Sequence, residues 1–135
     1  MAHLPENVVE LLNGGHVVWV ATIGPDGWPN IAIKGSGALV DDQHIFFADV
    51  FSKKTRDNLQ ANPVCAVGIY DHDKRIAMQV KGHATLVESG KLFDNVSERI
   101  AAKQPALPPV KYVVEIVVES IWDMSAGPTA GDRLA

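Results

Sequence analysis

The sequence predicts a mainly β (α+β) protein, in which six antiparallel strands form a barrel with about three short helices outside it. Apolar, β-branched runs of strand length are separated by turn signals, so most strands are expected to be joined as hairpins. Strands and helices do not alternate in the βαβ manner, and no glycine-rich turn joins a strand to a helix as in Rossmann or P-loop proteins. Together these observations favour an antiparallel barrel.

The first half of the chain is expected to contain one helix and three strands. Residues 4–13 carry apolar side chains at helical spacing, and Gly14-Gly15 ends that helix. Turn signals at 24–27 (Gly-Pro-Asp-Gly) and at Asp41-Asp42 fold the strands back on one another. The three strands, rich in β-branched and other apolar residues, are 17–23, 29–40 and 44–49.

The second half is expected to contain two helices, three strands and a tail without regular structure. A polar helix at 52–62 ends at Asn62-Pro63, and a second helix at 90–103 has one apolar face. A proline-rich link, 104–109, leads into the last strand, and the Gly- and Ala-rich tail begins at 125. The strands are 64–70, 76–88 and 110–122, the first two paired around residues 71–74.

Composition limits the class of protein. A chain of 135 residues has room for one domain, here residues 1–135, and its 47% apolar content predicts that some apolar surface is buried against another copy. The net charge of −4 argues against a nucleic-acid surface, and no apolar run is long enough for a bilayer. The N-terminus does not resemble a signal peptide, and Cys65 is the only cysteine. We therefore expect a cytoplasmic protein that contacts neither nucleic acid nor membrane.

The segment 51–59 is the first candidate site. Ser52 is expected to cap the helix, which places Lys53, Lys54 and Thr55 in the first turn. Lysines at the positive end of a helix dipole each cost roughly 0.3–1 kcal/mol unless an anion compensates them. A phosphate could accept hydrogen bonds from the free backbone N–H groups, the Thr55 hydroxyl and the ammonium groups. The alternative is an ordinary solvated helix start with lysines facing water.

The second candidate is the segment Ile33-Lys34-Gly35-Ser36-Gly37. Glycines inside a strand mark a bulge, a bend, or a close approach of the backbone to a ligand. A flat heterocycle could pair its polar rim with a backbone edge exposed there, and a simple barrel bend explains the glycines equally well.

Other side chains carry weaker signals. The five histidines have no metal-ligand spacing, so no metal site is predicted. Cys65 lies in an apolar strand and is expected to be a buried structural thiol, and Trp19 and Phe46 are expected in the core. Trp122 ends a strand beside the polar tail, where it could stack on a ligand or cover the mouth of the barrel.

A set of short motifs in a fixed order resembles the pyridoxamine 5′-phosphate oxidase-like family of FMN-binding split barrels. The resemblance covers residues 17–88, with a fainter similarity at the C-terminus. Each motif is weak alone, and the ordered combination is fairly specific. The motifs are Ala21-Thr22, then Asp26-Gly27-Trp28-Pro29, then Phe47-Ala48-Asp49, then Lys54-Thr55 with Asn58-Leu59 and Asn62-Pro63.

This resemblance implies a flavin mononucleotide (FMN) site in a homodimer. The phosphate would be held by Lys54 and Thr55, with Ser52 and Lys53 close by. The second strand would line the ring and the ribityl chain, and Ala48 and Asp49 would flank them. Gln79 would approach the flavin from the partner chain, and the flavin would lie at the subunit interface. The second-strand residues are Ile33, Lys34, Gly35 and Ser36.

The chain departs from the true pyridoxamine 5′-phosphate oxidases at its C-terminus. Trp122 and Arg133 match part of their substrate-binding segment, but the Arg and His expected to hold pyridoxal phosphate are missing. We therefore do not expect vitamin B6 oxidation. The leading expectation is an FMN-dependent oxidoreductase that reduces a small acceptor, with electrons from NAD(P)H or a redox protein. The alternatives are an FMN-binding electron-transfer protein, a deazaflavin- or haem-binding barrel, and a cofactor-free dimeric scaffold.

Overall fold

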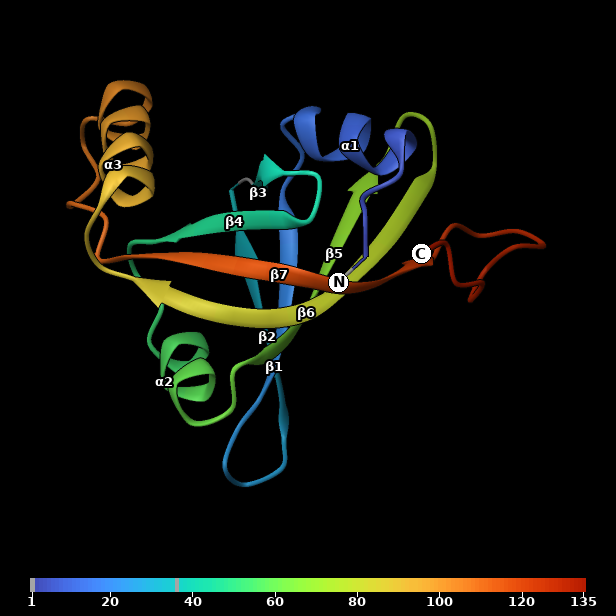
Figure 1. Cartoon of the computed structure of the whole chain (residues 1–135), viewed down its shortest axis with the longest axis horizontal. Helices are drawn as coiled ribbons and strands as arrows, with labels where there is room; N and C mark the ends of the chain where they lie inside the picture. The colour runs from blue at the N-terminus through green and yellow to red at the C-terminus, as the bar shows by residue number, and fades with distance from the viewer. Residues whose placement is uncertain (1, 36) are drawn as a thin grey trace.

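The computed structural model describes residues 2–35 and 37–135, which form one seven-stranded antiparallel sheet accompanied by three helices (Figure 1). The strand order across the sheet is β2-β1-β5-β6-β7-β4-β3. None of the helices in this described part is long and apolar enough to cross a bilayer. The elements, in chain order, are α1 (Glu6–Asn13), β1 (Val18–Ile23), β2 (Pro29–Lys34), β3 (Gly37–Asp41), β4 (His44–Asp49), α2 (Lys54–Ala61), β5 (Val64–Asp71), β6 (Ile76–Val87), α3 (Lys91–Lys103) and β7 (Tyr112–Asp123).

The predicted mainly β class with three helices is confirmed, but the number of strands and the closure of the sheet differ. The segment 29–40, expected to be one strand, is two strands, β2 and β3, which lie at opposite edges of an open sheet. Lys34 ends β2 and Gly37 begins β3, so the chain leaves one edge and joins the other within three residues. The glycines of this segment therefore mark a strand break, which raises the count from six to seven.

The short connection between β2 and β3 determines the curvature of the sheet. Three residues span at most about 11 Å. The two edge strands must therefore converge at this corner, although five other strands separate them in the hydrogen-bonding order. Figure 1 shows the resulting curled sheet, with β3 and β4 crossing over β1 and β2.

The inner face of the curled sheet holds the main core. Along β1, Val18 and Val20 point inward and are buried, whereas Trp19 and Ile23 point outward and are exposed. Helix α1 adds Val8 to this core, and the deepest members include Ile116 and Ile121 of β7. Phe46 is buried as expected, but the prediction that Trp19 belongs to the core is wrong, because strand alternation places it on the outer face.

A second, smaller core lies under α3. Phe46, Val96, Val110 and Val113 are its buried members, and residues at the end of β4 pack against them. Figure 1 shows α3 on one side of the C-terminal end of β4 and α2 on the other. The two helices therefore flank the same end of that strand.

The long pair β6–β7 organises the opposite end of the molecule. A bulge between Lys81 and Gly82 shifts its register, and a Cβ atom at Gly82 would lie 2.1 Å from the backbone oxygen of Val117, so only glycine fits. The tail that follows β7 was expected to lack regular structure, and this is only partly correct. It folds back so that Arg133 forms a bridge with Trp122 and the N–H of Leu134 donates to the carbonyl of Ile121.

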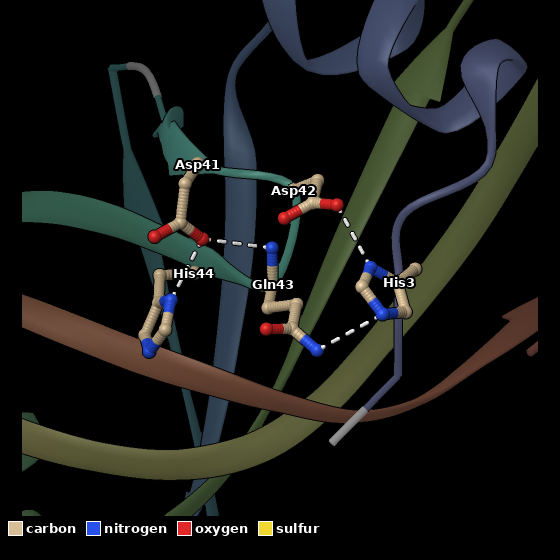
Figure 2. Close-up of polar contacts among 5 residues, drawn as sticks. All are labelled: His3, Asp41, Asp42, Gln43 and His44. Carbon is tan, nitrogen blue, oxygen red and sulfur yellow. Dashed lines mark hydrogen bonds and ion pairs between the residues drawn. The ribbon is translucent and has the colours of Figure 1, made fainter.

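The turn between β3 and β4 fastens the N-terminal segment to the sheet (Figure 2). His3 Nδ1 lies 2.8 Å from a carboxylate oxygen of Asp42, and the backbone N–H of Leu4 donates to the Asp42 carbonyl. Within the turn, Asp41 Oδ1 accepts the backbone N–H of Gln43 and lies 2.7 Å from His44 Nδ1. The hydrogen bond with His44 is the main cause that lowers the pKa of the Asp41 carboxyl, and the Gln43 N–H adds to it.

Replacing Asp41 by Asn should lower stability at neutral pH by less than about 1 kcal/mol, because the pair is largely exposed. A carboxyl whose pKa is lowered by folding stabilises the native state above its unfolded pKa, and this contribution is lost as pH falls through the folded pKa. Urea unfolding of both proteins should therefore show a difference at pH 7 that shrinks toward zero in strong acid. An undiminished difference in strong acid would contradict this assignment.

Candidate functional site

A cleft of about 250 Å³ opens at the corner where β2 and β3 meet. Three segments form its walls: the end of β2, the end of β4 with the residues after it, and the C-terminal end of α3 with the proline-rich link. The lining residues are Ile33, Lys34, Gly35, Ala48, Val50, Phe51, Ile100, Gln104 and Leu107. Four of the predicted cofactor residues are therefore brought together here: Ile33, Lys34, Gly35 and Ala48.

Gly35 leaves open space on its side of the cleft. Apart from its two chain neighbours, a Cβ atom built at this position meets no atom of the described residues within 4 Å. A small residue here keeps the backbone accessible, which fits the predicted close approach of a ligand. Ser36, predicted to share this role, lies outside the described residues.

A polar cluster of Lys34, Ser52 and Asp49 lies beside the cleft. Lys34 Nζ donates to the hydroxyl of Ser52, and the backbone N–H of Ser52 donates to Asp49 Oδ1 at 2.7 Å. Burial lowers the pKa of the Lys34 ammonium, and the negative charge of Asp49 opposes this effect. Asp49 is 1% exposed, and its second oxygen, Oδ2, is buried and has no hydrogen-bond partner among residues 2–35 and 37–135. An unpartnered buried acceptor is costly, so this oxygen is a site that a donor could satisfy.

The start of α2 differs from the predicted capping. Lys53, not Ser52, is the N-cap residue, and no side chain of the described residues caps the helix. Ser52 precedes the N-cap position by one residue. Its backbone N–H donates to Asp49 and its hydroxyl accepts from Lys34, so these groups are engaged outside the helix. The first-turn N–H groups of α2 therefore lack a side-chain acceptor, and Lys53 and Lys54 are exposed beside them. This arrangement suits an anion.

Two polar contacts hold α2 against the sheet. Asn58 Nδ2 donates to Thr22 Oγ1 of β1 at 3.0 Å, and both side chains are buried. Asn30 Nδ2 of β2 lies 3.4 Å from Thr55 Oγ1, and Thr55 is 3% exposed. The Thr55 hydroxyl therefore faces β2 rather than open solvent, next to the helix start where a phosphate was predicted.

Gln79 and Trp122, the other two predicted cofactor residues, lie away from the cleft on the outer face of the sheet. The strand registers place Ile33, Trp19, Gly68, Gln79 and Trp122 in one row across five strands. At about 4.8 Å per strand, Gln79 is some 14 Å and Trp122 some 19 Å from Ile33 along the sheet. Within one copy of the chain, these two residues do not share the cleft.

The centre of this outer face is apolar and exposed. The exposed fraction is 46% for Trp19, 67% for Ile31 and 57% for Ile33, and small residues lie between them on β1 and β5. Toward β7 the face becomes polar, and the ring of Trp122 has Lys81 Nζ 5.2 Å and the Arg133 guanidinium 5.7 Å from its centre. Large side chains exposed side by side are typical of a binding surface.

The sequence did not predict the α3 wall of the cleft. Ile100 was placed on the apolar face of a helix, and Gln104 and Leu107 lay in a link to which no function was given. Their spacing carries no binding signal, because only the tertiary packing of α3 beside β4 brings them to β2. Cys65 is buried as expected, and burial raises the pKa of its thiol to about 12, which makes it a poor nucleophile.

Comparison with known proteins gives one family and several similar structures. The family model for pyridoxamine 5′-phosphate oxidase matches residues 4–125. No curated protein sequence matches the chain. HupZ from Group A Streptococcus has a TM-score of 0.80 and 25% identity, covering 95% of this chain and 99% of its own.

Two further structures share the fold at lower identity. An FMN-binding protein from Syntrophomonas wolfei has a TM-score of 0.78 and 18% identity, covering 89% of this chain and 85% of its own. HutZ, a haem storage protein from Vibrio cholerae, has a TM-score of 0.68 and 14% identity, covering 90% of this chain and 95% of its own. One architecture therefore serves proteins with different ligands, so the choice of ligand must be argued from the cleft itself.

Replacing Asn58 by Ala should destabilise the protein by about 1–3 kcal/mol, because the buried hydroxyl of Thr22 loses its partner. Urea unfolding measures the loss. Because the two side chains interact, the double variant Asn58→Ala/Thr22→Val should be less destabilised than the sum of the single variants. Gln60→Ala, at an exposed position of the same helix, is the control. Additive losses would show that the contact does not anchor α2.

Proposed function

We propose that this chain, which belongs to the pyridoxamine 5′-phosphate oxidase family, binds FMN in the cleft at the β2–β3 corner and acts as a flavin-dependent oxidoreductase. The observation that carries the proposal is the basic start of α2, which no side chain caps and which lies immediately after the β4 end of the cleft. A ligand with both a phosphate and a flat ring would use the two features together.

The donors at the start of α2 fit a phosphate. Backbone N–H groups and the ammonium groups of Lys53 and Lys54 would all donate to its oxygens. Hydrogen bonds connect the segment before this helix to the neighbouring strands. Ser52 is bonded to Lys34 at the end of β2 and to Asp49 at the end of β4.

The cleft walls fit the ring and the ribityl chain of FMN. Ile33, Phe51 and Leu107 offer apolar surface to a ring, and the open space at Gly35 lets it approach the backbone. A ribityl chain carries hydroxyl groups, but Asp49 Oδ2 is buried behind the cleft wall and would have to become accessible before one of them could donate to it. When bound, FMN would supply the redox chemistry, and the protein would bind and orient it and exclude water from one face of the ring.

The cleft favours a flavin over haem. Within the described residues, no histidine lines it, so the most common haem ligand in proteins is lacking. The absence of the Arg and His residues that hold pyridoxal phosphate argues against vitamin B6 as the substrate. We therefore propose a small electron acceptor, with NAD(P)H or a redox protein as the electron donor. Turnover with NADH or NADPH separates this enzyme from an electron-transfer protein, which would be reduced only by another protein or by dithionite.

We further propose that two copies pair through the outer face and that the flavin lies between them. Exposure of the apolar centre of that face to water is unfavourable, and a second copy could bury it against the same apolar surface. Gln79 and Trp122 lie too far from the cleft of their own chain, so pairing is the arrangement that would let them contact a flavin.

Replacing Lys54 by Ala should weaken FMN binding about tenfold or more, because a charge-assisted contact to the phosphate is lost. Riboflavin, which lacks the phosphate, should bind almost equally to both proteins. Quenching of flavin fluorescence measures both affinities, and Lys91→Ala, a lysine at the start of α3, is the matched control. Unchanged FMN affinity in Lys54→Ala would mean that the phosphate is wrongly placed.

The absorption spectrum of the purified protein, with mass spectrometry of the chromophore released on denaturation, tests the cofactor directly. Two flavin bands and the mass of FMN are expected. A colourless protein that also fails to quench added FMN would overturn the proposal.

Replacing Ile31 by Lys should convert the dimer to a monomer without unfolding it, because the side chain is 67% exposed in the single chain. Size-exclusion chromatography with light scattering gives the molar mass. Val40→Lys, an exposed position on edge strand β3, should remain a dimer. A wild-type monomer at micromolar concentration would contradict pairing through this face.

A further inference from the structure

The wall of the cleft that α3 provides is weakly packed. Every residue of the segment 97–109, which comprises the second half of α3 and the proline-rich link, is described and at least partly exposed. This segment, called the α3 wall below, contributes Ile100, Gln104 and Leu107 to the cleft. The opposite wall, formed by the ends of β2 and β4, is held in the sheet by strand pairing. The cleft therefore has one firm wall and one weakly packed wall.

Hollows behind the α3 wall leave room for it to move. A hollow of about 330 Å³ lies between α3 and the proline-rich link, and another of about 250 Å³ lies between α3, the end of α1 and β4. Ile100 and Gln104 line both of these hollows and the cleft itself. The last turn of α3 therefore separates three hollows. Protein interiors are normally close-packed, so a turn with space on several sides can shift without displacing a well-packed core.

The attachment of α3 to the sheet permits the helix to tilt. Of its thirteen described residues only Val96 is buried, in the small core that is separate from the main one. The helix starts after Gly90, which has a φ of 100°. A Cβ atom at Gly90 would meet no atom of the described residues within 4 Å, its chain neighbours apart. A glycine with open space around it can change its backbone angles. The helix can therefore pivot near Val96, which moves its last turn.

The cleft is too small to enclose the proposed ligand. Pockets that bury drug-sized ligands have volumes of roughly 300–1,000 Å³, whereas the cleft measures about 250 Å³. FMN, with its ring system and its ribityl phosphate, belongs to that size class. To enclose the ring, the cleft has to widen. The α3 wall is the side that can move without breaking strand pairing, because few buried contacts hold it in place.

We propose that residues 97–109 form a movable wall, which tilts away from β2 when a flavin enters the cleft and then packs against the ring. This inference rests on the proposed function and goes beyond it, because it makes the free cleft a closed form of the site. The ligand would select the open form, in which it gains contact with both walls. The strand ends would stay in place, and Figure 1 shows α3 beside the C-terminal end of β4, where this movement would occur.

Replacing Ala101 by Phe tests the movement. Ala101 lines the hollow between α3 and the link but does not line the cleft, so the larger side chain fills the space behind the α3 wall rather than the ligand site. The affinities for FMN and for riboflavin should both fall by the same factor, roughly tenfold, because the open form becomes less populated. This pattern differs from that of Lys54→Ala, in which only FMN is affected.

The matched control is Ala102→Phe, because Ala102 is exposed and lines none of the three hollows. This control should bind both flavins as wild type does, and both variants should keep the wild-type melting temperature. Wild-type affinity for both flavins in Ala101→Phe would contradict the inference.

Distances between spin labels show the movement directly. One label is placed at Ala102→Cys on α3 and the other at Gln60→Cys on α2, whereas Cys65 is buried and stays unlabelled. With labelled chains diluted in unlabelled ones, electron–electron resonance should give a broad distance distribution that shifts and narrows when FMN binds. A pair at Gln60→Cys and Glu10→Cys, on α2 and α1, should not change. If FMN binds and the first distribution stays the same, the inference is wrong and the proposed function stands. If wild-type protein binds neither flavin, both are wrong.

Discussion

The connection between β2 and β3 is the constraint on which the rest of the molecule depends. It joins the two edges of a seven-stranded sheet within three residues, so the sheet has to curl until these edges converge. The curl encloses the main core on one side. It also leaves the cleft at the corner itself, which is lined by the ends of β2 and β4 and by the C-terminal end of α3.

The same curl gives the sheet two unequal faces. The inner face is filled by the chain's own side chains, whereas the outer face carries Trp19, Ile31 and Ile33 in neighbouring positions across β1 and β2. Ile33 lines the cleft and is also exposed on the outer face. Covering the outer face with a second copy would therefore also close one side of the cleft, and the proposed pairing would then be coupled to the proposed ligand binding.

The parts of the structure that follow from local chemistry could be predicted from the sequence. Strand alternation and turn residues located every element except the separate strands β2 and β3 to within a few residues, and helix-dipole chemistry singled out Lys53 and Lys54. The break within 29–40 could not be located, because a glycine in a strand predicts a bend, a bulge or a ligand equally well. Alternation also does not show which face is inside, so Trp19 was placed in the core. Gln104 could not be found because only tertiary packing brings α3 to β2.

The electrostatics of the corner explain why its polar residues are arranged around a cation. Lys34 is partly buried, and its charge is compensated by Asp49 and by the Ser52 hydroxyl rather than by solvent. Asp49 uses one oxygen to fix the chain before α2 and keeps the other unpaired. A ligand that brings negative charge to the start of α2 would satisfy its N–H groups and its lysines, and the phosphate of FMN would do so while its ring lay against the apolar walls of the cleft.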